Sequence, residues 1–250
     1  MPRILTLMGS GENSPVMVTP HQKIVKRFSK DALRINLDTP YGFQENADEL
    51  TKKIQGYFEV NVGAPISEVQ LRRTDSRTEL IDQADWVFSG PGSPSYALRV
   101  WKSNGTAEAL HRLIERGAVV MASAAAMTLG AKVMPVYEMY KVGDDPYWLE
   151  GINLLEAATG IKAAVVAHYN NTQGGTHDTR FCFIGEKRMT QLETQLGDCA
   201  ILGIDEHTGI TFDLEAGTAE IYGKGVITLK RGSEVRTFAA KEIVETSSLI

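Results

Sequence analysis

The stretch AVVMASAAAMTLGAKVMP, residues 118–135, passes from a strand to a helix and decides how the chain is organised. Its first five residues, 118–122, are apolar and partly β-branched, which predicts a buried strand. A helical pattern follows from Ala124 to about Ala131. The hydroxyl of Ser123 lies at the junction, where it is either a nucleophile on a tight turn or a small residue that lets the helix pack closely.

Short apolar runs alternate with longer amphipathic stretches up to residue 204. Helical patterns cover 45–58 and 106–117, and a glycine ends the second. This alternation indicates right-handed βαβ units and a largely parallel sheet with helices on both faces. The predicted strands are 3–8, 34–37, 68–72, 86–89, 118–122, 163–167 and 200–204.

The C-terminal segment 208–238 instead alternates apolar and polar residues between turns that contain glycine. This pattern predicts antiparallel hairpins at the edge of a sheet. Because the chain shows no internal repeat, low-complexity linker or break in composition, we predict a single α/β domain over residues 1–250 with three αβα layers.

The composition is that of a soluble protein, with 43% hydrophobic residues, 23% charged residues and a net charge of −5. A mildly acidic chain does not favour nucleic acid as a partner, since phosphate binding needs a basic face. Two cysteines, Cys182 and Cys199, are too few for a disulfide framework and lack metal-ligand spacing. The N-terminus has no signal-peptide pattern, and no apolar run approaches the roughly 20 residues that cross a bilayer. We expect a cytoplasmic protein without a membrane partner.

Ligands of such sheets bind beyond the carboxyl ends of the strands, where four loops should meet: 8–15, 89–98, 121–127 and 167–181. Ser123 would lie there at a nucleophile elbow. A serine needs an imidazole to take its proton, and His168 follows the apolar run AAVVA at a strand end. His177, in the loop GGTHDTR, competes for this role, but a strand end fixes His168 better.

The base in turn needs an acid that holds its tautomer. Glu138 comes fifteen residues after Ser123, just past the helix that Ser123 opens, and is our candidate. Asp178 and Glu206 are the alternatives.

The segment FSGPGSPSYALRVW, residues 88–101, predicts a strand, a glycine-containing turn and a helix that begins near Pro94. Its Gly92 N–H could join the Ala124 N–H in an oxyanion hole. Phosphate binding is the rival use of such a turn, but the sequence contains no GxxxxGK[ST] or GxGxxG motif.

Together these residues resemble the peptidase S51 family, which includes aspartyl dipeptidase and cyanophycinase, within the class I glutamine-amidotransferase-like superfamily. The resemblance covers most of the chain and rests on GSGE (9–12), FSGPGSPSYAL (88–98), SAAA (123–126), HYN (168–170) and GIDEHTGI (203–210), in the family's order. The sequence departs from the family where Met121 and Ala125 replace glycines around the serine, and where Ser93 replaces a common asparagine.

The resemblance implies a flavodoxin-like fold and a serine hydrolase that cleaves peptide or isopeptide bonds at aspartyl residues without a metal or other cofactor. It implies Ser123 as nucleophile, His168 as base and Glu138 as the orienting acid, with Gly92 and Ala124 in the oxyanion hole. The substrate would be a small aspartyl-containing peptide.

An aspartyl substrate carries a carboxylate, which an arginine binds in bidentate fashion. Arg180 is our candidate for this contact, with Ser93 as a second substrate-binding residue; Lys187 and Arg188 are weaker candidates.

Two other functions stay open. A non-catalytic binding protein would keep the scaffold and its pocket with a degenerate elbow. A metal-dependent hydrolase would use His168, His177 and Asp178, which lack the usual ligand spacing. The exposed edges of the C-terminal hairpins would suit a homodimer.

Overall fold

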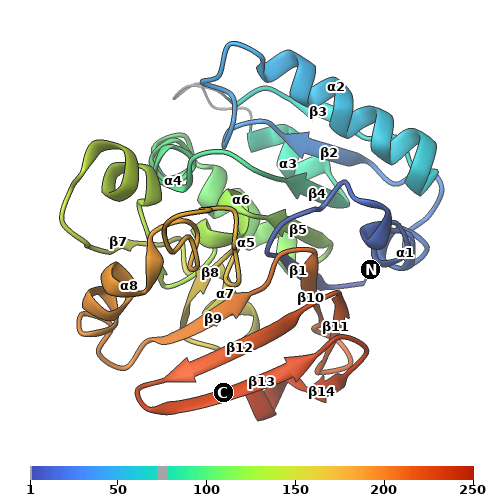
Figure 1. The fold of residues 1–250 in the computed structure, drawn as a ribbon. Helices are drawn as coiled ribbons and strands as arrows, with labels where there is room; N and C mark the ends of the chain where they lie inside the picture. The colour runs from blue at the N-terminus through green and yellow to red at the C-terminus, as the bar shows by residue number, and fades with distance from the viewer. Residues whose placement is uncertain (1, 72–77) are drawn as a thin grey trace.

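A computed structural model describes residues 2–71 and 78–250 of the chain (Figure 1). The strands are β1 (Ile4–Met8), β2 (Arg34–Leu37), β3 (Ser67–Val69), β4 (Trp86–Ser89), β5 (Ala118–Ala122), β6 (Lys132–Val133), β7 (Leu149–Glu150), β8 (Ala163–Val166), β9 (Ala200–Ile204), β10 (Thr208–Asp213), β11 (Thr218–Gly223), β12 (Val226–Arg231), β13 (Glu234–Ala239) and β14 (Ile243–Glu245).

The helices lie mostly in the first two thirds of the chain. They are α1 (Pro15–Val25), α2 (Ala47–Tyr57), α3 (Thr78–Gln83), α4 (Pro94–Ser103), α5 (Thr106–Ile114), α6 (Ala124–Thr128), α7 (Leu154–Thr159) and α8 (Gly185–Glu193), with the π-helical turns η1 (Phe58–Val62) and η2 (Glu138–Val142) and the 3₁₀ turn η3 (Thr246–Leu249). Among the described residues, none of these helices combines the length and the apolarity that spanning a membrane requires.

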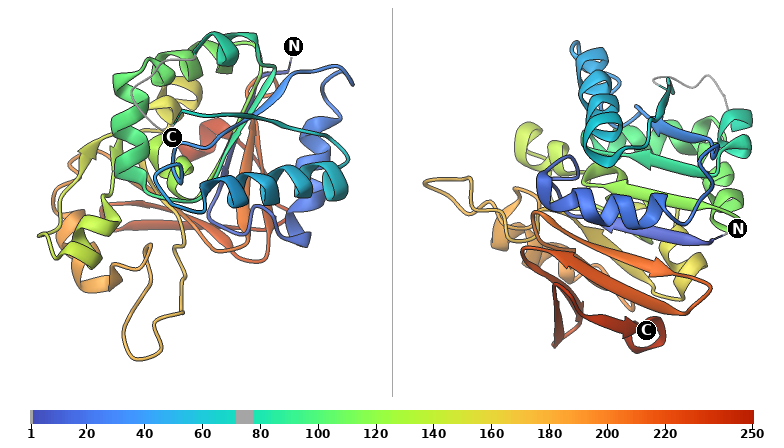
Figure 2. Two further views of the ribbon diagram at one scale, coloured as in Figure 1. Left: turned by 90° about the horizontal axis from the view of Figure 1, so that it is seen from above. Right: turned by 90° about the vertical axis from the view of Figure 1, so that its right-hand side faces the viewer.

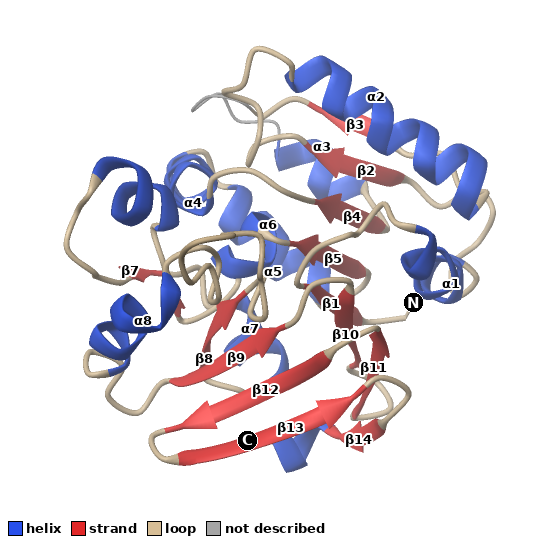
Figure 3. Ribbon diagram, in the orientation of Figure 1, coloured by secondary structure: helices blue, strands red, loops and turns tan. Residues whose placement is uncertain are grey.

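A mostly parallel sheet forms the centre of the molecule, in the strand order β14-β11-β10-β1-β5-β4-β2-β3. The five strands from β1 to β3 in this order run parallel, whereas β10, β11 and β14 add antiparallel pairs (Figure 3). The predicted α/β class is thereby confirmed. The strand predicted at 68–72 begins one residue earlier, as β3, and its expected end at Arg72 lies outside the described residues.

Alternation along the strands supplies two apolar faces, which helices cover on both sides (Figure 2). Ile4 and Met8 of β1 pack in one cluster with side chains of α1, α2 and η1, whereas Leu5 and Leu7 pack in another with side chains of α4 and α5. These two clusters join the sheet to the two helix layers of the predicted αβα arrangement.

The C-terminal hairpins divide between two sheets, which the sequence pattern did not indicate. The β10–β11 hairpin extends the central sheet, but β12 and β13 join β9 and β8 in a second sheet of order β13-β12-β9-β8. The ends of β1 and β9 approach so closely that a Cβ on Gly9 would lie 2.3 Å from the Asp205 carbonyl oxygen. A glycine at position 9 therefore lets the two sheets meet at the rim where their parallel strands end.

Candidate active site

Ser123 lies on the turn between β5 and α6 in a backbone conformation that few residues adopt, with φ 50° and ψ −120°. Such a conformation costs about 1–3 kcal/mol and persists only where surrounding contacts enforce it. The Ser123 N–H donates to the carbonyl of Met8 at the end of β1, at 2.9 Å. The turn is thus a strained elbow that presents the hydroxyl at the rim of the sheet.

The elbow forms although Met121 and Ala125 stand where the family carries glycines. Both side chains are fully buried and belong to the apolar cluster on the α4–α5 face of the sheet. The Met121 side chain therefore packs into the core, where it leaves the turn itself free.

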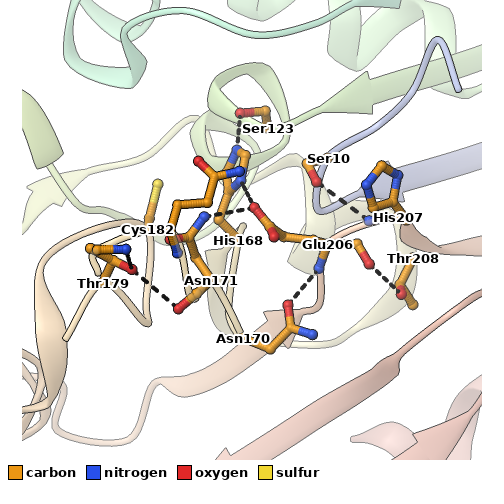
Figure 4. A network of polar contacts seen from close by, with 12 residues as sticks. Ser10, Ser123, His168, Asn170, Asn171, Thr179, Cys182, Glu206, His207 and Thr208 are labelled. Atoms are coloured by element: carbon orange, nitrogen blue, oxygen red, sulfur yellow. Dashed lines mark hydrogen bonds and ion pairs between the residues drawn. The ribbon is translucent and has the colours of Figure 1, made fainter. Parts of the chain in front are cut away.

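His168 follows β8 and faces the serine, as Figure 4 shows. Its Nε2 lies 2.9 Å from Ser123 Oγ, and its Nδ1 lies 2.9 Å from Glu206 Oε1. An ionised carboxylate only accepts hydrogen bonds, so Nδ1 carries the proton and Nε2 is left as the acceptor for the serine hydroxyl. His168 also has a positive φ of 49°, and its N–H donates to the Gly9 carbonyl at 3.4 Å.

Glu206 follows β9 and is anchored by two asparagines from the loop after His168. Asn171 Nδ2 donates to the same Oε1 atom at 2.8 Å, and the Glu206 N–H donates to Asn170 Oδ1 at 2.8 Å. Burial alone would raise the pKa of Glu206, but the hydrogen bonds from His168 and Asn171 outweigh it, so the pKa is lowered. The carboxylate that faces His168 is therefore kept ionised.

The structure places Glu206 rather than Glu138 beside His168, which corrects the expected acid. Because β8 and β9 are parallel neighbours, the residues that follow them emerge side by side at one rim. Glu138 instead begins η2, and its Oε1 accepts a hydrogen bond from Ser95 Oγ at 2.6 Å.

The other predicted bases and acids lie apart from the serine. His177 is exposed in the loop 170–181, and Asp178 is held by Arg180. The metal alternative of His168, His177 and Asp178 is not brought together, and within residues 2–71 and 78–250 no cluster of three His, Cys, Asp or Glu side chains could hold a metal ion.

The expected oxyanion-hole residues lie at the same cavity as Ser123. Gly92 has a φ of 139°, and a Cβ there would lie 1.9 Å from the Pro40 carbonyl oxygen, so only glycine fits. Ala124 is the first residue of α6, where a helix has no acceptor of its own for the N–H. The Ala125 N–H donates to the Gly90 carbonyl at 3.2 Å and ties the two turns together.

The cavity has a volume of about 220 Å³. It is lined by Ser123 and His168, by the backbone turn residues Gly92 and Ala124, and by apolar, aromatic and sulfur-containing residues: Pro91, Pro94, Met127, Val136, Tyr137, Cys182 and Phe183.

Neither of the two expected substrate-binding residues lines the cavity beside Ser123. The Arg180 guanidinium already binds Asp178 through Nε at 3.0 Å and Nη2 at 2.9 Å, and it also pairs with Glu186. Ser93 caps α4, because its Oγ accepts the Tyr96 N–H at 3.2 Å. Both side chains therefore have local structural roles.

Sequence reasoning missed Asn171, whose side chain is completely buried against Glu206. It also missed Glu12, a buried residue of the GSGE loop; desolvation raises its pKa, although nearby His168 and His207 oppose this. The rule that singled out His168, a polar residue directly after a predicted parallel strand, points to Asp205 after the strand 200–204, and Glu206 is the next residue along the chain.

Comparisons with known proteins identify the family and the fold of the chain. The model of peptidase family S51 matches residues 5–218. Among solved structures, a peptidase from an acI-B1 Actinobacterium has a TM-score of 0.75 at 20% sequence identity, covering 98% of this chain and 97% of its own. A protein assigned as a peptidase E from Listeria monocytogenes EGD-e has a TM-score of 0.59 at 16% identity, covering 96% and 100%. No curated protein sequence matches the chain.

Proposed function

We propose, from the premise that this chain belongs to peptidase family S51, that it is a serine peptidase whose catalytic triad is Ser123, His168 and Glu206. The observation that carries the proposal is the chain of two 2.9 Å contacts from Ser123 Oγ through the imidazole to the Glu206 carboxylate. A nucleophile, a base and an orienting acid within hydrogen-bond reach are what acyl transfer requires.

In the proposed reaction, Ser123 Oγ attacks the scissile carbonyl carbon and its proton passes to His168 Nε2. The carbonyl oxygen becomes an oxyanion, which the N–H groups of Gly92 and Ala124 stabilise. When the C–N bond breaks, the amine leaves with the proton from His168. Water then attacks the acyl-serine ester, gives a proton to His168, and releases the acid as the serine is restored. Glu206 keeps Nδ1 protonated and stabilises the imidazolium throughout.

Aspartyl specificity is a separate part of the expected function, and it stays a prediction of the family resemblance. A cationic side chain positioned to bind the substrate carboxylate would support this specificity. Arg180 could serve only after leaving Asp178 and Glu186, which hold its guanidinium in the structure.

The test is labelling with a fluorophosphonate, read by intact mass. Phosphorus takes the place of the carbonyl carbon, fluoride leaves, and the Ser123 proton passes to His168. We expect one adduct on the wild type and none on Ser123→Ala. A folded wild type that gains no adduct would favour a non-catalytic binding protein on the same scaffold.

A further inference from the structure

The cavity beside Ser123 has an apolar wall of a size that suits one side chain. Met127, Val136, Cys182 and Phe183, together with Pro94, supply most of this wall, which we call the Met127–Phe183 pocket. An apolar cavity of about 150 Å³ accepts a benzene ring in another protein, and this one has about 220 Å³.

The wall is mostly buried. Met127 is fully buried, Cys182 is 6% exposed, and their sulfur atoms lie 3.8 Å apart. Burial raises the pKa of the Cys182 thiol to about 12 and also raises the pKa of Tyr137. Burying an apolar group against such a wall gains about 25 cal/mol per Å², whereas burying an unpaired carboxylate is costly.

The charges near the pocket also disfavour an anion. Of the described residues that line it, none is a lysine or arginine. Glu138 adjoins Tyr137 in the chain, and its Oε2 is buried without a hydrogen-bond partner among the described residues. A substrate carboxylate here would meet no lysine or arginine among the described lining residues.

Phe183 is held rigidly at the side of the catalytic histidine. Phe181, Cys182 and Phe183 all have a positive φ, between 56° and 72°. Backbone hydrogen bonds fix this unusual turn, among them Cys182 N–H to the His168 carbonyl at 3.3 Å and Phe183 N–H to the Thr179 carbonyl at 2.9 Å. The Phe183 ring lies 5.6 Å from the His168 ring. A wall ordered in advance costs little entropy when a ligand binds.

We infer that the Met127–Phe183 pocket binds an uncharged apolar side chain of the acyl residue, of the size of leucine, methionine or phenylalanine. The inference rests on the proposed function. The scissile carbonyl oxygen would lie at the N–H groups of Gly92 and Ala124, which line this same cavity. The side chain one carbon away from that carbonyl therefore enters the apolar part.

The test compares diphenyl aminoalkylphosphonates whose side chains are those of leucine, asparagine and aspartate, three nearly equal shapes. Ser123 Oγ displaces one phenol from phosphorus, so the rate of adduct formation by intact mass reports on the side chain. We expect the leucine reagent to react at least about ten times faster than the aspartate reagent, with asparagine between them. An aspartate reagent as fast as the leucine one would overturn the inference.

The fluorophosphonate, which has no side chain to recognise, separates the two proposals. Labelling by it with no reaction of any aminoalkylphosphonate would contradict the apolar pocket and leave the hydrolase standing. If the fluorophosphonate forms no adduct, the result contradicts the proposed hydrolase and therefore this inference as well.

Phe183→Ala tests the wall itself. It should slow the leucine reagent about ten-fold more than it slows the fluorophosphonate; equal loss of both rates would indicate a disturbed elbow and contradict a specificity role. Phe43→Ala is the matched control, because its ring is 51% exposed and does not line the cavity. Neither rate should change in that variant.

Discussion

His168 is held at both ring nitrogens, and its backbone is held as well. Glu206 fixes the proton on Nδ1, and Ser123 meets the free Nε2. The N–H groups of Ser123 and His168 donate to consecutive carbonyls, those of Met8 and Gly9. The end of β1 thus helps to set the distance between Ser123 and His168, and these two strained residues are positioned by one strand.

Asn171 should influence the reaction although it does not reach the substrate. Its amide donates to Glu206 Oε1, and a hydrogen bond to a charged group contributes about 1.5–3 kcal/mol. For Asn171→Ala we expect kcat/KM, or the fluorophosphonate labelling rate, to fall about ten-fold. The pKa of Glu206 should rise when it loses a donor. The acid limb of the pH–activity profile should therefore move to a higher pH than in the wild type.

The exposed Asn61→Ala variant is the control, and its pH profile should match the wild type. An Asn171→Ala enzyme with a lower rate but an unchanged pH profile would show that Asn171 acts only on the fold.

At the scale of the elements, the parallel strand ends decide which residues meet. Ser123, His168 and Glu206 follow β5, β8 and β9, so all three emerge at the rim where the two sheets join. The first two could be predicted from the sequence, because each directly follows an apolar run. Glu206 is only an alternative to Glu138 in the sequence, because Glu138 comes just past the helix that Ser123 opens and the family resemblance implies it as the acid. The pairing of β8 with β9 reversed that order, and the pattern of residues does not reveal which strands pair.

The turn from β4 to α4 should be the least tolerant element of the rim. Gly92→Ala forces a side chain onto the Pro40 carbonyl at a φ of 139°. We expect the free energy of unfolding to fall by at least about 1–3 kcal/mol in urea titrations.

Gly56→Ala is the control, and it should change the free energy of unfolding in the opposite direction. Gly56 lies inside α2, and a Cβ added there would meet nothing within 4 Å, so alanine should stabilise the helix by about 0.5–1 kcal/mol. Equal effects of the two substitutions would contradict the geometry of the turn.

At the scale of the whole molecule, the α1–α2 side of the sheet buries a titratable group. His21 lies among Tyr57, Phe58 and Phe88, and its Nε2 is 2.9 Å from the Glu12 carbonyl oxygen. Desolvation lowers the pKa of His21 from 6.5 to about 4. The core on this side therefore holds a neutral imidazole that must gain a proton when the chain unfolds in mild acid.

Stability should consequently fall as the pH decreases through this window. Between about pH 6.5 and pH 4 the unfolded chain binds a proton at His21 that the folded chain does not, so unfolding becomes easier toward acid, by about 2–3 kcal/mol in total. His21→Phe should flatten this dependence in urea titrations across that range, whereas the exposed His177→Gln should leave it as in the wild type. A His21→Phe variant as acid-sensitive as the wild type would exclude His21 as the cause.

The central claim concerns which carboxylate completes the triad, and one pair of variants addresses it most directly. We would measure the rate of fluorophosphonate labelling in Glu206→Gln and Glu138→Gln. An amide at position 206 no longer holds the imidazole in the productive tautomer, and the corresponding change in another serine protease costs about 10⁴ in kcat. We predict a loss of about 100-fold or more for Glu206→Gln and less than about three-fold for Glu138→Gln. A large loss in Glu138→Gln with Glu206→Gln near the wild-type rate would contradict the account.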